Sequence, residues 1–264
     1  MASVERTRGL IEAYSRQIAL LRLTARGLNP VMIEPLAIER LDVSTPQSQA
    51  VIFLNMMPYF VVLVVFVGGM YVIIDATAGE RERGSLEPLL INPVRRWEFV
   101  LGKLAAALPF AIFTLFLTLL AFAAAFNLFP IEDYVGFQLT LDPLALMGIF
   151  LVSLPMILLA SALQMIIATF TRSFKEAQTY VAFLPLIPAL PGIGLAFLPV
   201  KPALWTMLIP TFGQQLLINQ LMRGEPVNLA NVAISTVVTL LVAAVLIDIA
   251  VRLYQDERIL FGPK

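Results

Sequence analysis

The chain has 264 residues, of which 59% are hydrophobic and only 14% charged, with a mean hydropathy of +0.86 and a formal net charge of zero. Ordinary soluble domains are about 45–50% apolar and about 25% charged, so this composition excludes a soluble domain and indicates a protein solvated by lipid. The zero net charge gives no indication of a nucleic-acid partner. Cysteine and histidine are both absent, which excludes disulfides, Cys/His metal sites and histidine-based catalytic triads.

Five apolar runs are long enough to cross a membrane. A spanning helix needs about 20 residues, because it rises about 1.5 Å per residue through a hydrocarbon core of about 30 Å. Pro185, Pro188 and Pro191 in the fourth run predict a kink or a break there. The sequence therefore predicts an all-α, polytopic bundle of membrane helices, whose spans are residues 51–74, 104–129, 144–170, 180–200 and 232–251.

A further stretch, residues 203–222, begins apolar and becomes polar, and Pro210 and Gly213 interrupt it. We interpret it as a helix that enters the bilayer part-way and returns, or as a short extracytoplasmic pair of helices, with a full span as the main alternative. Irregular backbone at membrane depth is tolerated only where protein or water covers it. This stretch is therefore expected to pack inside the bundle.

Loop charges predict the orientation, because Lys and Arg are retained on the cytoplasmic side. The loop from Arg81 to Lys103, the link at residues 171–179 and the C-terminus are basic and are placed inside. Arg95, Arg96 and Trp97 at the end of that loop suit a helix at the lipid interface. The acidic loop at residues 130–142 is placed outside.

This orientation also places residues 1–50 outside, although six arginines lie there. We expect this part to be the remnant of an extracytoplasmic segment or an N-terminal amphipathic tail. Residues 51–264 are expected to form one transmembrane domain.

The segment between the first two spans contains a short apolar helix within residues 79–93, GERERGSLEPLLINP. Ser85 can cap its start, Pro88 is tolerated in its first turn, and Asn92 before Pro93 ends it after about two turns. A helix of two turns is unstable alone in water, so we expect it to dock into a groove on another protein. The alternative is that the charges only anchor the loop in water and lipid headgroups.

Residues 80–103, with ERERGSLEPLL, Pro93-Val94 and Leu101-Gly102-Lys103, resemble the cytoplasmic loop of type-2 ABC exporter permeases. Within that family they are most similar to the sodium-extrusion (NatB-like) branch. Three other segments resemble the second cytoplasmic loop, the closing signature and the end of the large extracytoplasmic segment of this branch, namely residues 171–180, 252–260 and 29–42.

The resemblance implies a non-catalytic permease subunit of an ATP-driven exporter in the prokaryotic cytoplasmic (inner) membrane. Its partners would be cytosolic ABC ATPase subunits and a second permease half, in a homo- or heterodimer, and its cargo a small solute or ion such as Na⁺. Family members begin with a membrane helix and a long external region, so we expect this chain to lack that N-terminal helix. The loop would be the coupling helix that contacts the ATPase, through Glu80, Glu82, Gly84, Ser85, Leu86 and Glu87.

The sequence contains no G-x-x-x-x-G-K-[ST] phosphate loop, so it lacks the usual means of holding ATP phosphates. We therefore expect no cofactor on this chain, with ATP and Mg²⁺ bound by the partner ATPase. No catalytic residue and no metal site is predicted.

Polar residues within predicted spans are costly in lipid and often functional. Asp248 precedes Arg252 by four positions, so the two share a helix face and are predicted to form a structural ion pair, with a role in an ion path as the alternative. The other polar residues could instead form hydrogen bonds between helices or face external water, and this structural interpretation is the alternative to a functional one. The candidates for a translocation path or gate are Asn55, Gln164, Gln214, Gln215 and Asn219.

Two other classes of function compete with the exporter subunit. A stand-alone secondary transporter or channel predicts charges deep in the spans and paired broken helices, whereas the sequence has Asp248 near one end and a single strongly broken region. An intramembrane enzyme without His or Cys would need a Ser/Lys pair or paired aspartates, and no Lys lies inside a predicted span. The exporter subunit is therefore favoured.

Overall fold

The computed structural model describes residues 46–85, 88, 93–128, 142–197 and 200–255, together with Tyr14, Ile18, Arg22, Ala25 and Arg26. For residues 46–54, 127–128 and 196–197 the backbone alone is described. The chain divides into two units, residues 1–43 and 44–264. The architecture given below is that of the second unit.

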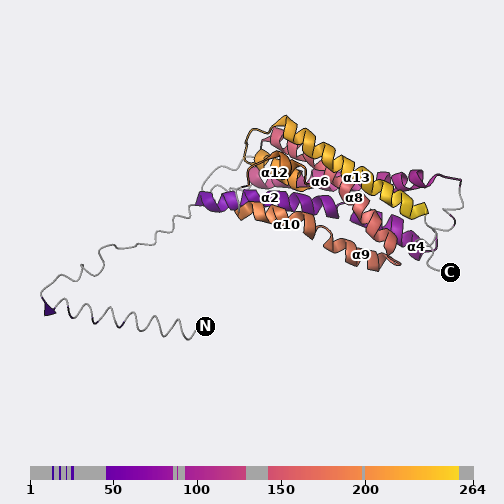
Figure 1. Cartoon of the computed structure of the whole chain (residues 1–264), viewed down its shortest axis with the longest axis horizontal. Helices are drawn as coiled ribbons and strands as arrows, with labels where there is room; N and C mark the ends of the chain where they lie inside the picture. Colours follow the sequence, from indigo (N-terminus) through magenta and orange to yellow (C-terminus); the bar gives the residue numbers. More distant parts are fainter. Residues whose placement is uncertain are drawn as a thin grey trace. The chain divides into compact units, whose positions relative to one another are not determined.

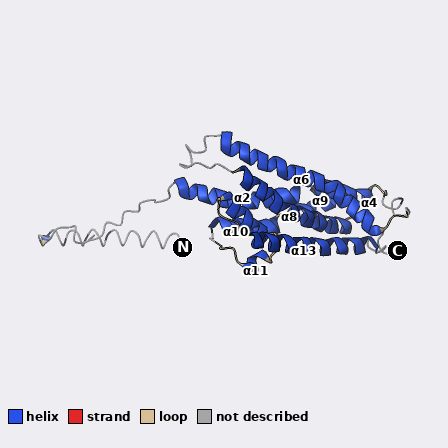
Figure 2. Cartoon of the chain, turned by 90° about the horizontal axis from the view of Figure 1, so that it is seen from above, coloured by secondary structure: helices blue, strands red, loops and turns tan. Residues whose placement is uncertain are grey.

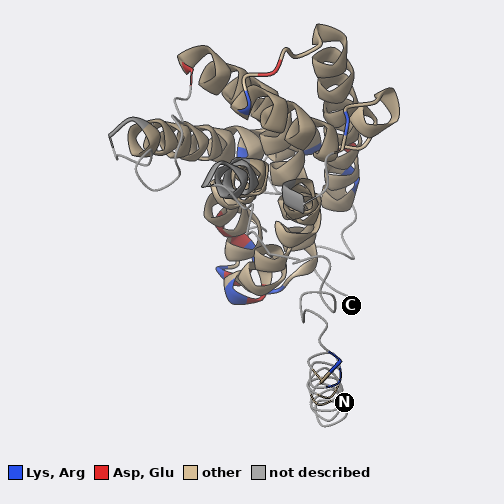
Figure 3. Cartoon of the chain, turned by 90° about the vertical axis from the view of Figure 1, so that its left-hand side faces the viewer, with Lys and Arg blue, Asp and Glu red and all other residues tan. Residues whose placement is uncertain are grey.

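Every regular element in the described part of the second unit is a helix, and no strand occurs there (Figures 1 and 2). Acidic and basic residues are sparse along these helices (Figure 3). The all-α polytopic bundle is therefore confirmed, with five helical segments long and apolar enough to cross a membrane: Asn55–Glu82, Arg96–Phe126, Pro143–Phe170, Phe174–Leu195 and Leu229–Gln255.

The first span is assembled from four consecutive helical pieces. Gly68 and Gly69 separate the first two pieces, and a Cβ atom added at Gly68 would lie 3.1 Å from the Cα of Ala111. The absence of a side chain therefore lets the second span approach closely. The four pieces are α2 (Pro46–Val67), α3 (Met70–Ile74), the π-helical turn η2 (Asp75–Gly79) and α4 (Glu80–Glu82).

The second span, α6 (Arg96–Leu128), is a single helix of 33 residues. The interfacial helix predicted around Arg95–Trp97 is therefore not a separate element, because the spanning helix already begins at Arg96. Lys103, which was predicted to lie in the loop, sits about two turns inside this helix.

The third span, α8 (Pro143–Phe170), begins where its sequence predicts. The Asp142 side chain accepts a hydrogen bond from the backbone N–H of Leu144 at 3.1 Å, and Pro143 occupies the first turn. This N-cap satisfies a donor that the helix itself leaves without a partner.

The fourth span is broken at Pro185, as its prolines predict. Helix α9 (Phe174–Phe183) ends just before this residue and α10 (Leu186–Phe197) begins just after it. Pro188 and Pro191 are accommodated inside α10. Helix α10 packs mainly against α2.

The stretch at residues 203–222 forms two short helices, α11 (Leu204–Met207) and α12 (Phe212–Met222). Eleven residues of helix extend about 16 Å, so α12 is too short to span the membrane. It packs against α2, α8 and α13 (Leu229–Gln255), and most of its side chains are buried. The prediction of a short helical pair inside the bundle is confirmed.

We call the end of the bundle at which α4, the start of α9 and the end of α13 lie the inner end, because the loop charges predict that it faces the cytosol (Figure 1). Helix α12 and the start of α2 lie at the opposite, outer end. The main core between the two ends is apolar and includes Val62, Phe66, Met156 and Leu217.

Helix α10 touches α2 through Gly192. A Cβ atom added at Gly192 would lie 3.0 Å from the backbone N and Cα of Tyr59, whereas Gly194 on the same helix has open space. We predict that Gly192→Ala lowers the free energy of unfolding by about 1–3 kcal/mol, because backbone must move to admit the methyl group. Thermal or denaturant unfolding of the purified chain measures this effect.

Gly194→Ala is the matched control, because it makes the same chemical change on the same helix without a clash. It should be neutral or slightly stabilising, since Ala favours a helix over Gly. Equal loss of stability in both variants would contradict the close approach of α10 and α2.

Candidate functional site

The ammonium group of Lys103 joins α6 to the end of the first span. The Lys103 side chain is 6% exposed, and its Nζ donates to the backbone carbonyl of Ala76 and to the carboxylate of Glu80. Ala76 belongs to η2, and a π-helical turn interrupts the regular i→i−4 bonding of the helix. The rings of Phe99 and Tyr254 lie 4.3 and 5.9 Å from Nζ, so aromatic faces add to the stabilisation of the charge. We call these five residues the Lys103 clamp.

The first and second inner loops contact each other next to this clamp. Nη1 of Arg81 donates to the backbone carbonyl of Thr171 at 2.8 Å, and the backbone N–H of Phe174 donates to Oε2 of Glu82 at 2.7 Å. Phe174 is the first residue of α9, where a carboxylate is favoured by the unpaired N–H groups and the helix dipole. The side chains of Glu80 and Glu82 are thus both engaged within the chain.

Gly84 and Ser85 turn the chain sharply after α4. Gly84 has a φ of +67° and its N–H donates to the carbonyl of Arg81, while the N–H and Oγ of Ser85 both donate to the carbonyl of Glu80. This pair of backbone bonds is a Schellman motif, in which glycine supplies the left-handed residue. Ser85 therefore completes the end of α4. Leu86 and Glu87, also predicted to contact an ATPase, lie outside the described residues.

Arg83 bonds back to the same helix. Its Nη1 lies 2.7 Å from Oδ1 of Asp75, with both side chains about half exposed. The hydrogen bond to this carboxylate raises the pKa of the Arg83 guanidinium. Since arginine is already charged at any physiological pH, the contact orients the side chain without creating a pH-dependent switch.

A second polar cluster lies at the outer end, between α2 and α12. The side-chain oxygen of Asn55 accepts hydrogen bonds from Nη2 of Arg223 at 2.6 Å, from Nε of Arg223 at 3.0 Å and from Nδ2 of Asn219 at 3.2 Å. Asn55 is buried. We call these three residues the outer latch, because they tie the end of the short helix α12 to the first span.

The remaining predicted path residues face different helices. The Gln164 amide donates to the carbonyl of Phe66 and joins α8 to α2. Gln214 donates to Ser235 and Thr239 on α13, while Nε2 of Gln215 donates to the carbonyl of Pro188 on α10 at 2.5 Å. Gln214, Gln215 and Asn219 lie on α12, and among the five candidates a hydrogen bond joins Asn219 to Asn55.

Asp248 and Arg252 form an ion pair on the outward face of α13. Nε of Arg252 lies 2.8 Å from Oδ2 of Asp248, and the side chains are 75% and 57% exposed. This is the i,i+4 pair that the sequence predicts. No group of three or more acidic residues that could hold a metal ion occurs within the described ranges.

Comparison with known proteins identifies the family. Residues 8–252 match the family model described as ABC-2 family transporter protein. The chain belongs to this family. The resemblance to type-2 ABC permeases is therefore confirmed.

Two relatives illustrate the similarity. The chain is 27% identical over 217 residues to the ABC transporter permease protein NatB of Bacillus subtilis (strain 168). The aligned region covers 81% of this chain and 56% of that protein. The chain is 30% identical over 123 residues to the probable multidrug ABC transporter permease YbhR of Escherichia coli (strain K12), covering 39% of this chain and 33% of that protein. The chain thus spans about half the length of NatB and a third of YbhR. No solved structure matches it.

The contacts of two residues were not predicted from the sequence. Lys103 was counted as a loop charge and as part of the motif Leu101-Gly102-Lys103, and Arg223, which follows the stretch at residues 203–222, was not named. One signal was available, since no proline lies between Arg96 and Lys103 and the helix could have been extended over these residues. The partner of Arg223 lies 168 positions away, and local pattern carries no information on it.

The outer latch yields a stability prediction. We expect Asn55→Ala to lower the free energy of unfolding by about 1.5–3 kcal/mol, because it removes the acceptor of a partly buried guanidinium. Asn55→Asp keeps the acceptor and adds an opposite charge, so it should retain the stability of the wild type. Denaturant unfolding of both purified variants tests this, and equal destabilisation by the two changes would show that the hydrogen bonds to Arg223 are unimportant.

Proposed function

We propose that this chain is the membrane-spanning permease subunit of an ATP-driven exporter, in which a separate cytosolic ATPase drives the export of a small solute or ion. The observation that carries the proposal is the linkage of both inner loops through Arg81, Glu82 and the Lys103 clamp. A protein that contacts this region from the cytosol would act on several spans at once. Membership of the ABC-2 family supports the same role.

The proposed transmission of force follows the contacts at the inner end. A displacement of the turn at Gly84 would move α4, to which it is joined by the Schellman bonds. Glu82 would pass this movement to the first residue of α9, and the ion pair of Glu80 with Lys103 would pass it to α6. Because packed helices move as rigid bodies rather than deform continuously, a small shift of the loop would change the arrangement of whole spans.

This arrangement refines the roles of the predicted coupling residues. We propose that Glu80 and Glu82 hold the loop in position, since their carboxylates bond within the chain. The surface offered to the ATPase would then be the turn at Gly84 and Ser85 and the segment after it, which includes Leu86 and Glu87.

The proposed assembly has the partners that the sequence resemblance implies. ATP and Mg²⁺ would be bound by the cytosolic ATPase subunits, and a second permease half, identical or different, would complete the path across a prokaryotic inner membrane. The cargo is proposed as a small solute or ion. Na⁺ is one such ion, suggested by the resemblance of residues 80–103 to the sodium-extrusion branch.

Two substitutions in the first inner loop test the proposal. Glu82→Lys places a cation against the start of α9, where a helix disfavours positive charge. Gly84→Pro removes the N–H that bonds Arg81 and forces φ near −65° at a position that needs +67°. We expect both variants to insert into the membrane normally and to lose most ATP-driven export by reconstituted vesicles containing the ATPase.

Glu98→Lys provides the control, because Glu98 is an exposed acid at the same end of the bundle and its carboxylate accepts a hydrogen bond from the backbone N–H of Arg95, three positions earlier. It should leave export close to the wild-type rate. Full ATP-dependent export by both loop variants, together with normal capture of the ATPase, would rule out the proposed coupling.

A further inference from the structure

An elongated pocket opens on the surface where the third and fourth spans meet at the inner end. Its volume is about 530 Å³, within the range of about 300–1,000 Å³ that accommodates drug-sized ligands. It lies between the last turns of α8 and the outward faces of α9 and α10, and its lining residues are Ile167, Phe170, Thr171, Glu176, Tyr180, Phe183, Leu184 and Ile187.

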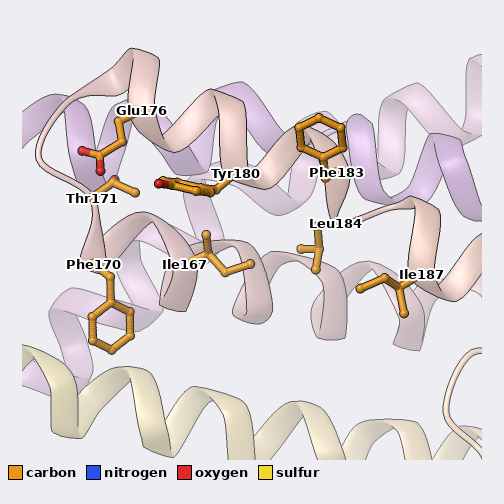
Figure 4. Close-up of a pocket in the computed structure, with 8 residues that line it drawn as sticks. All are labelled: Ile167, Phe170, Thr171, Glu176, Tyr180, Phe183, Leu184 and Ile187. Carbon is orange, nitrogen blue, oxygen red and sulfur yellow. The ribbon is translucent and has the colours of Figure 1, made fainter.

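The pocket has a polar end and an apolar end (Figure 4). The carboxylate of Glu176 and the hydroxyl end of Tyr180 lie near Thr171, whereas Phe183, Leu184 and Ile187 line the opposite end. Eleven residues separate Glu176 on α9 from Ile187 on α10, and the break at Pro185 lies between them. Because the polar end lies toward the inner end of the bundle, we expect the pocket to run from the membrane interface into the hydrocarbon region.

The Glu176 carboxylate has capacity for a further partner. Its Oε2 accepts a hydrogen bond from the backbone N–H of Arg172 at 2.8 Å, while the Oγ of Ser173 caps the N–H of Glu176. The hydrogen bond from Arg172 thus occupies one of the two carboxylate oxygens of Glu176. Within the described part of the chain, no Lys or Arg side chain forms an ion pair with Glu176. Three cations lie near this end of the pocket: Arg172 and Lys175 are close to Glu176 in the chain, and Arg81 donates to the carbonyl of Thr171, but none of the three lines the pocket.

From this geometry we infer that the pocket binds a hydrophobic organic cation of drug size. The positive group would lie at the Glu176 carboxylate and against the ring of Tyr180, since both carboxylates and aromatic faces attract cations. The apolar body would lie along Phe183, Leu184 and Ile187, in a surface that is open to the inner leaflet. A ligand dissolved in that leaflet with its charge at the interface would already have this orientation. That such a ligand is cargo rests on the exporter function proposed above, whereas its binding does not.

Equilibrium binding of tritiated tetraphenylphosphonium tests the inference. The full chain is placed in phosphatidylcholine nanodiscs, and binding to empty nanodiscs is subtracted. We expect saturable binding to the wild type, and an affinity at least about fivefold weaker in Glu176→Gln, the loss of one partly desolvated ion pair. Gln keeps an acceptor for the N–H of Arg172, so the start of α9 should be preserved.

Three controls separate the effects of charge and of shape at the pocket from a general effect on binding. Glu98→Gln removes a carboxylate that caps the other inner helix in a similar way, and it should bind tetraphenylphosphonium like the wild type. Ile187→Trp fills the apolar end at an exposed position and should weaken binding without any change of charge. Neutral triphenylphosphine oxide should bind more weakly than the cation and should not distinguish Glu176→Gln from the wild type.

The inference is overturned if the wild type shows no saturable binding, if Glu176→Gln and Glu98→Gln bind the cation equally, or if Ile187→Trp leaves its affinity unchanged. These measurements use no ATPase and no transport. A failure of these binding predictions therefore leaves the exporter proposal intact. Conversely, if Glu82→Lys had no effect on export, the binding site would still stand.

Discussion

Within the described residues, the inner end of this bundle is organised around the buried cation of Lys103. In a protein surrounded by lipid, the ammonium group of Lys103 must find its acceptors within the chain, because an unpaired charge in an apolar interior costs several kcal/mol. The carbonyl of Ala76 and the carboxylate of Glu80 supply them. This requirement fixes how far α6 is shifted along the first span, and the position of α4 follows from it. Glu82 is then placed to cap α9, which brings the second inner loop against the first.

At the outer end, too, a cationic side chain finds its acceptor within the chain. The guanidinium of Arg223 lies against the oxygen of Asn55, so the short helix α12 is anchored to the first span by directional bonds. Between the two ends, α2 meets α10 mainly through apolar contact and the close approach at Gly192. Polar contacts thus help to set the register of the helices at each end, and the hydrogen bond from Gln164 to the carbonyl of Phe66 does so within the core. Such a bundle is suited to rigid movements of whole helices.

Hydropathy was sufficient to predict the five spans, because lipid requires an apolar surface along the entire length of a helix. The break at Pro185 was also predictable, since proline has no N–H to continue the helical ladder. The partners of Lys103 and Arg223 could not be predicted from the sequence, because these contacts depend on how segments far apart in the chain pack together. The resemblance predicts that Glu80 and Glu82 contact another protein, and the structure adds that both carboxylates bond within the chain. The motif alone does not predict these internal partners.

A double-mutant cycle on Lys103 and Glu80 tests the central claim most directly. Lys103→Met and Glu80→Gln are made singly and together, and the free energy of unfolding of each purified chain is measured. Each single change leaves one member of a buried pair without its partner, at a cost of about 3–5 kcal/mol, whereas the joint change removes both members. The loss of unfolding free energy in the double variant should therefore be smaller than the sum of the two single losses by at least about 2 kcal/mol. Additive losses, within about 0.5 kcal/mol, would show that the ammonium group of Lys103 does not hold the inner end together.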